Sequence, residues 1–414
     1  TAYKEKKVLG AQRALQFGGD QLLRHHARLF NCSASYADRP EFFGECLYLM
    51  LCGCGVGFSV QRPHTATMPK IQKRTKDPKT FTVPDSIEGW ARALDVLMSS
   101  FFEGGGVHHE YEGHKVYFDL SEIRPKGAFI SGGFKAPGPE PLRLALDRIQ
   151  TLIQGRIKVN GTLRPIDIYD ITMHAADAVI SGGVRRAATI CLFSLDDQEM
   201  MRAKTGNWFF ENPQRARSNN SVVLIRDEVS YQELESIIKS IKEYGEPGFV
   251  FSDDIDNLFN PCCEISLYPK TEDGKTGFSF CNLTDINGGK STSKKKFFEQ
   301  CQAAAILGTL QAGYNDFRFL NEETHRIVEE ECLIGVGITG WMNNPDILFD
   351  EDTMEEGAEI VKATNRLISE MIGVKPSPRC TTVKPSGNSS TVLGTTSGIH
   401  GENSERYIRH VQFN

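Results

Sequence analysis

The segment Asn260-Pro261-Cys262-Cys263-Glu264 brings an amide, a thiol and a carboxylate together. In an extended backbone, alternate side chains project to the same side, so an extended loop tip would direct residues 260, 262 and 264 toward one ligand. Two further candidate thiols lie in Cys281-Asn282-Leu283, nineteen residues after Cys262, and in Asn31-Cys32-Ser33, far upstream. Two cysteines can give up two electrons by forming a disulfide. The segment therefore predicts a site for thiol-based redox chemistry.

The composition is that of a protein that can bury a full core. Its 414 residues, of which 40% are hydrophobic, suffice for one large α/β domain or two to three ordinary ones. A net charge of −6 argues against a nucleic-acid-binding coat, so a phosphate ligand would need local basic groups or backbone amides. No run of about 18 apolar residues could span a bilayer, and residues 1–7 lack the apolar core of a signal peptide.

Eleven cysteines without a secretory signal indicate a reducing cytoplasm, which would be the host cytoplasm for a viral protein. No Cys-x-x-Cys pair occurs. Cys46, Cys52 and Cys54 are as crowded as metal ligands, but no second cluster of Cys or His completes four ligands. We interpret these three as small buried side chains near a strand and expect no metal in this chain.

Strand and helix patterns alternate along the chain. Apolar alternation predicts strands at 56–60, 116–120, 221–225 and 335–339. Asp85-Ser86-Ile87-Glu88 resembles a capping box that opens a helix with an apolar face from Ile87 to Phe101. Residues 231–241 form a second apolar stripe, which ends at Gly245-Glu246-Pro247-Gly248. We interpret both stripes as core, and the alternation predicts an α/β architecture.

Five further segments accompany the three cysteine segments. They are Gly53-Cys54-Gly55-Val56-Gly57-Phe58-Ser59-Val60, Ile123-Arg124-Pro125-Lys126-Gly127-Ala128, Gly182-Gly183-Val184-Arg185-Arg186-Ala187-Ala188, Ser218-Asn219-Asn220-Ser221-Val222 and Thr381-Thr382-Val383-Lys384-Pro385-Ser386-Gly387-Asn388-Ser389-Ser390. In this order, the segments resemble the catalytic subunit of a ribonucleotide reductase over nearly the whole chain. The resemblance implies a ten-stranded α/β barrel in which Cys262 lies on a finger loop threaded through the centre.

The resemblance also implies a domain organisation. Residues 1–414 would form a single reductase barrel domain. The N-terminal ATP-cone domain would be absent, and the C-terminal tail with its shuttle cysteine pair is not in this chain. Residues 61–120 form a segment longer than in many relatives, which we interpret as an insertion near the effector site. Either the protein is a reduced family member or the chain stops early.

Five residues receive catalytic roles from the resemblance. A sulfur radical on Cys262 would take the 3′ hydrogen of the ribose, and Glu264 would act as the base for the 3′-hydroxyl. Asn260 would hold the hydroxyls by hydrogen bonds. Cys32 would donate a proton as water leaves and would then form a disulfide with Cys281, which supplies the reducing electrons.

The resemblance assigns the substrate phosphates to a loop rich in serine. Its hydroxyls and backbone amides lie on a glycine-containing turn, which suits an anion without net positive charge. The residues concerned are Ser386, Gly387, Asn388, Ser389 and Ser390, with Ser33 nearby. From composition alone, the same loop reads as an ordinary surface loop.

The effector site is assigned to a second glycine-containing loop. Ser181-Gly182-Gly183-Val184-Arg185-Arg186 resembles the loop that reports to the active site which deoxynucleotide is bound. Gly182 and Gly183 would let the backbone move, and Arg185 could reach a base or a phosphate. Asp38 and Arg62 stand where the family places effector contacts.

One motif suggests a different ligand. Gly335-Val336-Gly337-Ile338-Thr339-Gly340 matches the dinucleotide fingerprint G-x-G-x-x-G. Trp341, Asn343 and Pro345 stand where the following helix should start. We therefore interpret this segment as a barrel strand.

The activity implied by the resemblance is that of an oxidoreductase of DNA replication, which reduces ribonucleoside di- or triphosphates to 2′-deoxyribonucleotides. The radical source would be adenosylcobalamin, which the glycine-rich motifs favour, or a metal-containing, radical-generating small subunit. A dNTP effector such as dTTP would control specificity and promote a homodimer, and a thioredoxin- or glutaredoxin-type protein would act as reductant. No nucleic acid or membrane partner is expected. Two alternatives stay open: a catalytically inactive nucleotide-binding regulatory protein and a cysteine-ligated metal protein.

Overall fold

The computed structural model describes residues 2–130, 135–179, 188–401, 404, 406, 408 and 410. The chain divides into two compact units. The larger unit comprises Gln16–Phe280 and Asn315–Val328, and the smaller unit comprises Thr1–Leu15, Cys281–Tyr314 and Glu329–Asn414. Both contain helices and strands, which confirms the predicted α/β class. Among the described residues, no helix has the length and apolar character needed to cross a membrane.

The larger unit is built on a six-stranded sheet with the order β11-β2-β3-β6-β7-β8, in which β2, β3, β6, β7 and β8 run parallel. Its strands are β2 (Cys32–Tyr36), β3 (Gly55–Ser59), β4 (Lys76–Thr82), β5 (His114–Asp119), β6 (Thr189–Ser194), β7 (Ser218–Ile225), β8 (Gly248–Ser252), β9 (Leu258–Phe259), β10 (Ser266–Leu267) and β11 (Ser279–Cys281). Its helices are α2 (Asp20–Arg24), α3 (Phe42–Leu51), α4 (Arg62–Thr65), α5 (Ile87–Phe101), α6 (Glu140–Ile157), α7 (Pro165–Val179), α8 (Gln198–Met201), α9 (Trp208–Glu211) and α10 (Tyr231–Tyr244). The strands predicted at 56–60, 116–120 and 221–225 are confirmed as β3, β5 and β7.

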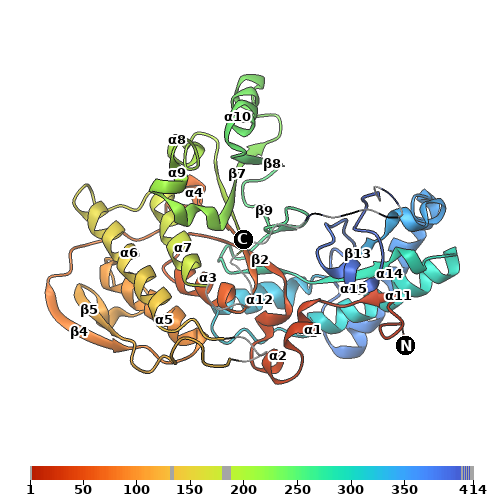
Figure 1. Cartoon of the computed structure of the whole chain (residues 1–414), viewed down its shortest axis with the longest axis horizontal. Coiled ribbons are helices and arrows are strands. Elements are labelled where there is room, and N and C mark those ends of the chain that lie inside the picture. Colours follow the sequence, from red (N-terminus) through yellow and green to blue (C-terminus); the bar gives the residue numbers. More distant parts are fainter. Residues whose placement is uncertain are drawn as a thin grey trace. The chain divides into compact units, whose positions relative to one another are not determined.

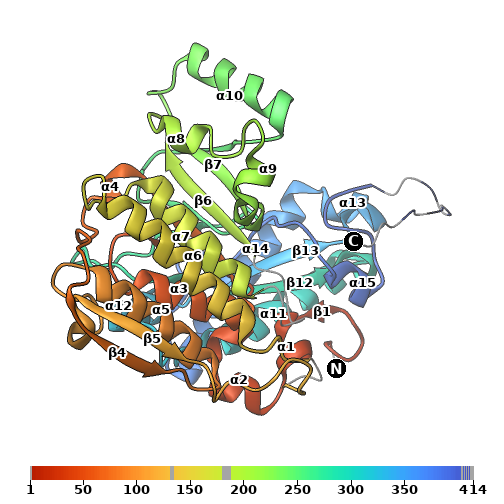
Figure 2. The same ribbon diagram turned by 60° about the vertical axis from the view of Figure 1, so that its left-hand side comes forward.

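A layer of helices packs on one face of β3. Helix α3 packs against α5 and α7, and α6 packs against α7, so the four helices lie together (Figure 1, Figure 2). The ring of Phe58 in β3 lies 5.8 Å from that of Phe42 in α3 and 6.5 Å from that of Tyr169 in α7, measured between centroids. Val56 and Phe58 are fully buried. These alternate residues of β3 therefore face the helical layer.

The opposite face of β3 carries glycines because a hairpin lies against it. Strands β9 and β10 pair antiparallel, with Phe259 opposite Ser266. A Cβ atom added to Gly57 would lie 2.1 Å from the carbonyl oxygen of Phe259, and one added to Gly55 would lie 3.2 Å from Cγ of Pro261. Any side chain at position 57 would therefore push the hairpin away from the sheet. The segment predicted to form the finger loop lies on this hairpin.

Helix α5 connects the parallel strands β4 and β5. Its predicted apolar face is confirmed, since Trp90, Leu94 and Leu97 are buried. Its cap lies one residue later than predicted: the hydroxyl of Ser86 accepts a hydrogen bond from the amide of Gly89 at 2.9 Å. Asp85 instead forms an ion pair with Arg124, so its carboxylate is not available to cap the helix.

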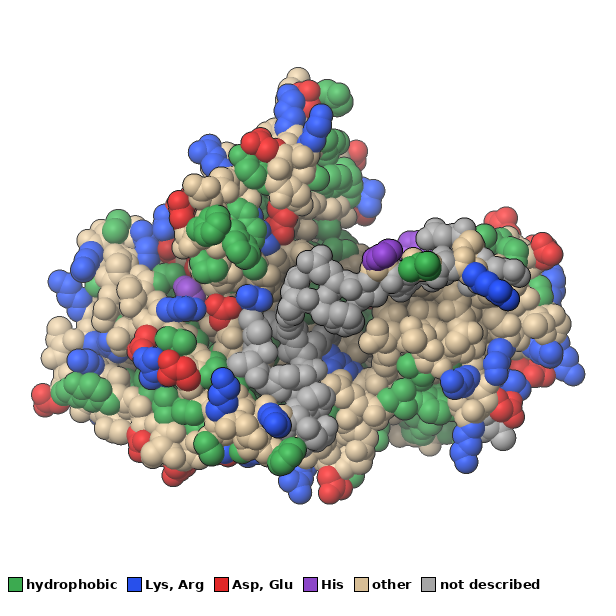
Figure 3. Space-filling model, viewed as in Figure 1, with side chains coloured by type: hydrophobic (Ala, Val, Ile, Leu, Met, Phe, Trp, Pro, Cys, Tyr) green, Lys and Arg blue, Asp and Glu red, His purple; other side chains and the backbone are tan. Residues whose placement is uncertain are grey.

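The prediction that the stripe of residues 231–241 belongs to the core is wrong for most of its length. Helix α10 has the Ser230–Glu233 capping box and ends at the left-handed Gly245, as the flanking glycine predicted. Only Ile237 is buried, whereas Tyr231 is 77% and Ile238 50% exposed. The helix packs on β8, the last strand of its sheet. Figure 3 shows apolar side chains at the surface around α9 and α10.

The smaller unit has its own sheet, in which β12 pairs antiparallel with β1 and parallel with β13. Its elements are β1 (Val8–Leu9), β12 (Leu283–Asn287), α11 (Lys294–Ala312), β13 (Gly335–Thr339), α13 (Pro345–Leu348), α14 (Glu351–Ile372) and α15 (Ser389–Leu393). Helices α1 (Arg13–Phe17) and α12 (Glu322–Glu331) each contain one of the boundaries between the units. Helix α11 packs against α14 over a core that includes Phe297, Cys301 and Val361.

The predicted ten-stranded barrel is not found as a closed sheet in the part of the chain that the structure describes. The strands there form four separate sheets, of which the largest has six strands. Strands β9 and β10 pair only with each other, so the hairpin adds no strand to the large sheet. The mixed α/β class is confirmed, and the closed barrel stays a prediction.

Replacing Gly57 by alanine tests the packing of the hairpin on β3. The new methyl group would collide with the backbone of Phe259, so we expect the free energy of unfolding to fall by about 1–3 kcal/mol. Gly155→Ala is the matched control, because a Cβ there meets nothing within 4 Å and alanine favours the interior of α6. Thermal unfolding of both variants measures the difference. A Gly57→Ala protein as stable as the wild type would contradict the packing described.

Candidate active site

The tip of the hairpin is a tight turn. The backbone amide of Cys263 donates to the carbonyl oxygen of Asn260 at 2.8 Å. The backbone amide of Asn260 donates to the carbonyl oxygen of Ile265 at 3.2 Å. Cys263 has a φ of 62°, which lies in the left-handed region. The segment is therefore not an extended tip, and the simple alternation of side chains expected for residues 260, 262 and 264 does not apply.

Two polar atoms at this turn are buried and have no hydrogen-bond partner among the described residues. They are Nδ2 of Asn260, a donor, and Oε2 of Glu264, an acceptor. Oδ1 of Asn260 is used within the turn, where it accepts from the amide of Ile265 at 3.1 Å. A buried polar atom without a partner costs about 1–3 kcal/mol. This cost would be offset by a ligand that offers both an acceptor and a donor, such as a hydroxyl group.

The two thiols of the tip are exposed. Cys262 and Cys263 are the exposed members of the eleven cysteines, all of which are present as thiols. Asn260, directly before Pro261, is fully buried. The turn therefore buries the side-chain amide of Asn260 and exposes the thiols of Cys262 and Cys263.

Cys32 lies at the same level of the sheet as the tip. It is the first residue of β2, and its partner in the register with β3 is Gly55. Gly55 is also the residue against which Pro261 packs. Register partners on adjacent strands project to the same face, so the buried side chain of Cys32 shares the face of β3 that carries the hairpin.

Cys281 is the last residue of β11, the neighbour of β2 in the six-stranded sheet. Its side chain is buried. One of the boundaries between the two units falls between Phe280 and Cys281. The pairing of Cys32 with Cys281 stays a prediction.

The residues predicted to bind substrate phosphates fall in both units. In the larger unit, the buried hydroxyl of Ser33 donates to the carbonyl oxygen of Gly55 at 3.3 Å. In the smaller unit, the hydroxyl of Ser386 accepts from the amide of Ser390 at 3.1 Å and lies 3.1 Å from the hydroxyl of Ser389. Gly387 and Asn388 are exposed at the same turn. Their role in phosphate binding stays a prediction.

The G-x-G-x-x-G segment is a strand, as predicted, and its glycines serve packing. It forms β13, and a Cβ added to Gly337 would lie 3.2 Å from Cγ of Lys384. Nζ of Lys384 pairs with Oδ2 of Asp285 at 3.0 Å, and the two side chains are 8% and 6% exposed. The glycine therefore admits the stem of a buried lysine that fixes the start of the serine loop to the sheet.

The predicted effector residues are only partly within the described residues. Gly182, Gly183 and Arg185 lie outside them. Asp38 accepts a hydrogen bond from Arg39 at 3.0 Å, and the exposed Arg62 pairs with Asp196 at 3.2 Å. Each side chain thus has a neighbour of opposite charge, and their effector role stays a prediction.

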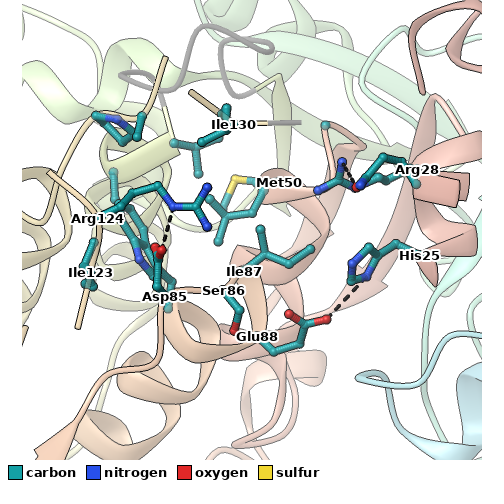
Figure 4. Close-up of a pocket in the computed structure, with 18 of the residues that line it drawn as sticks. His25, Arg28, Met50, Asp85, Ser86, Ile87, Glu88, Ile123, Arg124 and Ile130 are labelled. Carbon is teal, nitrogen blue, oxygen red and sulfur yellow. Dashed lines mark hydrogen bonds and ion pairs between the residues drawn. The ribbon is translucent and has the colours of Figure 1, made fainter. Parts of the chain in front are cut away.

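A separate cavity of about 370 Å³ lies in the larger unit. Figure 4 shows Arg124, from one of the family-like motifs, directed at Asp85, with their ion pair at 2.6 Å. On another wall, His25 pairs with Glu88 at 3.3 Å, and burial lowers the pKa of His25. Two further arginines, Arg24 and Arg28, also line the cavity. Apolar residues complete the lining: Met50, Leu51, Ile87, Trp90, Ile123 and Ile130. Three arginines against two carboxylates favour an anionic ligand.

The cluster Cys46, Cys52 and Cys54 is buried, as predicted. Burial raises the pKa of Cys52 to about 12, so this thiol stays protonated at neutral pH. Among the described residues, no group of three or more His, Cys, Asp or Glu side chains is arranged to hold a metal ion.

Sequence reasoning missed two groups of residues. The arginines of the cavity come from segments that are far apart in sequence, and only Arg124 stands in a recognised motif. His64, Asp256 and Lys270 meet at the base of the hairpin. Asp256 and Lys270 flank the cysteine motif, but no spacing rule predicts that their side chains meet.

Comparisons with known proteins agree with the family resemblance. Residues 63–153 match the family described as B12-dependent ribonucleotide reductase, insertion domain. This range overlaps the predicted insertion at 61–120 and extends beyond it. The chain is 28% identical over 380 residues to the adenosylcobalamin-dependent ribonucleoside-triphosphate reductase of Lactobacillus acidophilus, covering 80% of this chain and 48% of that protein. It is 26% identical over 441 residues to the enzyme of the same name from Euglena gracilis, covering 99% and 56%.

A solved structure shows a similar fold. The crystal structure of a B-12 dependent (class II) ribonucleotide reductase matches with a TM-score of 0.75 at 22% identity, covering 95% of this chain and 65% of that one. The resemblance to ribonucleotide reductase catalytic subunits is confirmed by these matches. The chain spans about half the length of the curated relatives that it matches.

The exposure of the hairpin tip predicts which thiols react first. Iodoacetamide should alkylate Cys262 and Cys263 in the native protein well before the other nine cysteines, because those are buried. Peptide mass spectrometry over a time course measures the order, and denatured protein is the control in which all eleven should react. Early alkylation of Cys32 in the native protein would contradict the burial described.

Proposed function

We propose that this chain is the catalytic part of a ribonucleotide reductase that converts ribonucleoside triphosphates to 2′-deoxyribonucleotides. The observation that carries the proposal is the hairpin tip, where the exposed Cys262 stands beside an unpaired buried donor of Asn260 and an unpaired buried acceptor of Glu264. These are the groups that a ribose with two adjacent hydroxyls would satisfy. The names of the relatives support the triphosphate as substrate.

The reaction can be written with its atoms balanced. A thiyl radical on Cys262 takes the 3′ hydrogen atom, which forms an S–H bond and leaves a carbon radical. Glu264 accepts the proton of the 3′-hydroxyl, and Cys32 protonates the 2′-hydroxyl, which leaves as water. Cys32 and Cys281 then form a disulfide, which delivers one hydrogen atom to the 2′ carbon and one electron to the sugar, while Glu264 returns its proton to the 3′ oxygen. Finally, Cys262 returns its hydrogen atom to the 3′ carbon.

The radical source that the relatives' names indicate is adenosylcobalamin, which when bound supplies the radical that activates Cys262. The position of Cys262 fits this role, because an exposed thiol at a hairpin tip can be reached by a bulky group from outside. An external dithiol protein of the thioredoxin or glutaredoxin type would return the disulfide to two thiols.

The serine loop would hold the substrate phosphates. Support comes from the exposed Gly387 and Asn388 and from Lys384, whose ion pair with Asp285 fixes the loop to β12. We also propose that the hairpin occupies the centre of a ten-stranded barrel. The fold match to a class II reductase supports this arrangement.

Cys262→Ser tests the radical site. We expect deoxynucleotide formation to fall below detection, because an O–H bond is too strong to exchange hydrogen with the 3′ carbon. Cys263→Ser is the matched control at the neighbouring exposed position and should retain most of the activity. Product formation from ribonucleoside triphosphate with adenosylcobalamin and a dithiol reductant is measured by chromatography. Substantial turnover by a correctly folded Cys262→Ser protein would reject the assignment.

The cavity of Figure 4 is the best candidate for the deoxynucleotide effector. Its arginines suit phosphates, and Met50, Ile87 and Trp90 suit a base. Val179, which lines it, stands two residues before the start of the predicted specificity loop in sequence. We therefore place effector binding at this cavity in addition to Asp38 and Arg62.

Arg124→Ala tests this placement. Losing one charged hydrogen-bond donor costs about 1.5–3 kcal/mol, which corresponds to a weakening of dTTP binding by roughly 10- to 100-fold. Lys126→Ala is the control. It removes an equal charge only two residues after Arg124, but Lys126 is exposed and does not line the cavity. Calorimetric titration with dTTP measures both. Equal affinities in the two variants would remove the cavity from the proposal.

A further inference from the structure

An ion pair closes the base of the catalytic hairpin. Asp256 precedes β9 and Lys270 follows β10, and Nζ of Lys270 lies 2.7 Å from Oδ2 of Asp256. The two strands are joined at one end by the turn that carries Cys262 and at the other by this pair. The pKa of Asp256 is lowered overall: burial raises it, but the hydrogen bonds from Lys270 and His64 outweigh burial.

His64 binds the other oxygen of the same carboxylate. Its Nε2 lies 3.0 Å from Oδ1 of Asp256, and its Nδ1 lies 2.7 Å from the hydroxyl of Ser59. The hydroxyl oxygen of Ser59 accepts from the amide and from Nε2 of Gln61, both at 3.2 Å. The hydrogen of Ser59 is therefore directed at Nδ1, and Nε2 carries the proton donated to Asp256. Burial lowers the pKa of His64, which agrees with a neutral ring.

The backbone at the hairpin base is held as well. The hydroxyl of Tyr36 donates to the carbonyl oxygen of Asp256 at 2.6 Å, and Nε2 of Gln61 donates to that of Ile255 at 3.0 Å. The rings of Tyr36 and His64 pack with centroids 4.3 Å apart. Tyr36 and Ser59 are the last residues of β2 and β3 and are partners in the register.

These contacts lie at the opposite end of β3 from the reactive tip. The base is bound where β2 and β3 end, at Tyr36 and Ser59, whereas the tip packs on Gly55, where β3 begins. Between them, glycine at position 57 leaves no side chain that could interlock with the hairpin. The position of the tip along β3 therefore depends on where its base is anchored.

We propose that Asp256, His64 and Lys270 form a clasp that sets the position of Cys262 along β3, and that His64 and Lys270 act as positioning residues for the radical cysteine. The inference rests on the function proposed above for Cys262. His64 belongs to the segment that matches the insertion-domain family. This segment therefore contacts the catalytic hairpin directly, through one imidazole ring.

The clasp is tested with Lys270→Met and His64→Ala. Both variants should lower kcat by roughly 10- to 100-fold, because small displacements of a reacting group have effects of this size. KM for the ribonucleotide should change by less than about twofold, since the phosphate contacts are untouched. Amide hydrogen exchange of residues 257–269, measured by mass spectrometry, should become about tenfold faster. Lys270→Arg keeps the charge and should restore most of both properties.

Asp273→Asn is the matched control. It removes the charge of an exposed ion pair with Arg326, at 3.2 Å, only three residues beyond Lys270. It should leave kcat and hydrogen exchange at wild-type values. If Lys270→Met does not fold, Asp256→Asn replaces it, because asparagine keeps an acceptor for His64 and loses the ion pair.

The outcomes separate the clasp from the function on which it rests. Unchanged exchange in residues 257–269 would overturn the clasp, and so would a loss of kcat without faster exchange. Faster exchange in the clasp variants alone, combined with absence of reductase activity in the wild type, would support the clasp as a structural anchor and reject the proposed function.

Discussion

The structure of the site depends on one close approach, that of the hairpin backbone to Gly57. A methyl group at this position would lie 2.1 Å from the carbonyl oxygen of Phe259, so the strand can carry the hairpin only without a side chain there. On its other face the same strand packs Val56 and Phe58 into the helical layer. The alternation of glycine with large apolar residues in β3 thus serves two different neighbours. It places the cysteine tip at the level of Cys32.

Burial of polar groups at the tip distinguishes it from an ordinary turn. Asn260 is fully buried but leaves its Nδ2 unpaired, and Glu264 leaves Oε2 unpaired. By contrast, the buried Asn365 of the smaller unit and its neighbours satisfy each other, because its Nδ2 donates to the hydroxyl of Thr309 and its Oδ1 accepts from the amide of Ser377, both at 2.9 Å. A structural role would favour such mutual pairing, since each unpaired buried group lowers stability. The two unpaired atoms at the hairpin are the groups that the proposed substrate would satisfy.

Local sequence patterns predicted local structure well where burial followed amphipathicity. The stripe of α5 is buried beneath α3, and the strands around Val56, Val116 and Val222 are confirmed. The equally clear stripe of α10 is mostly exposed, because the helix packs on the edge strand β8. Periodicity reports which residues share a face, but what covers that face depends on the topology of the sheet.

The sequence by itself singled out Cys32, Asn260, Cys262, Glu264 and Cys281 as candidate reactive groups, whose roles stay a prediction, and the resemblance of the chain to ribonucleotide reductases is confirmed by the comparisons. Only the tertiary structure decided that the cysteine motif is a tight turn, that its amide and carboxylate are unpaired, and that His64 and Lys270 anchor its base. The reason is physical. Chemistry resides in side-chain types, which the sequence states directly, whereas packing and hydrogen bonding join residues that are far apart in the chain, such as His64 and Asp256, which are 192 positions apart.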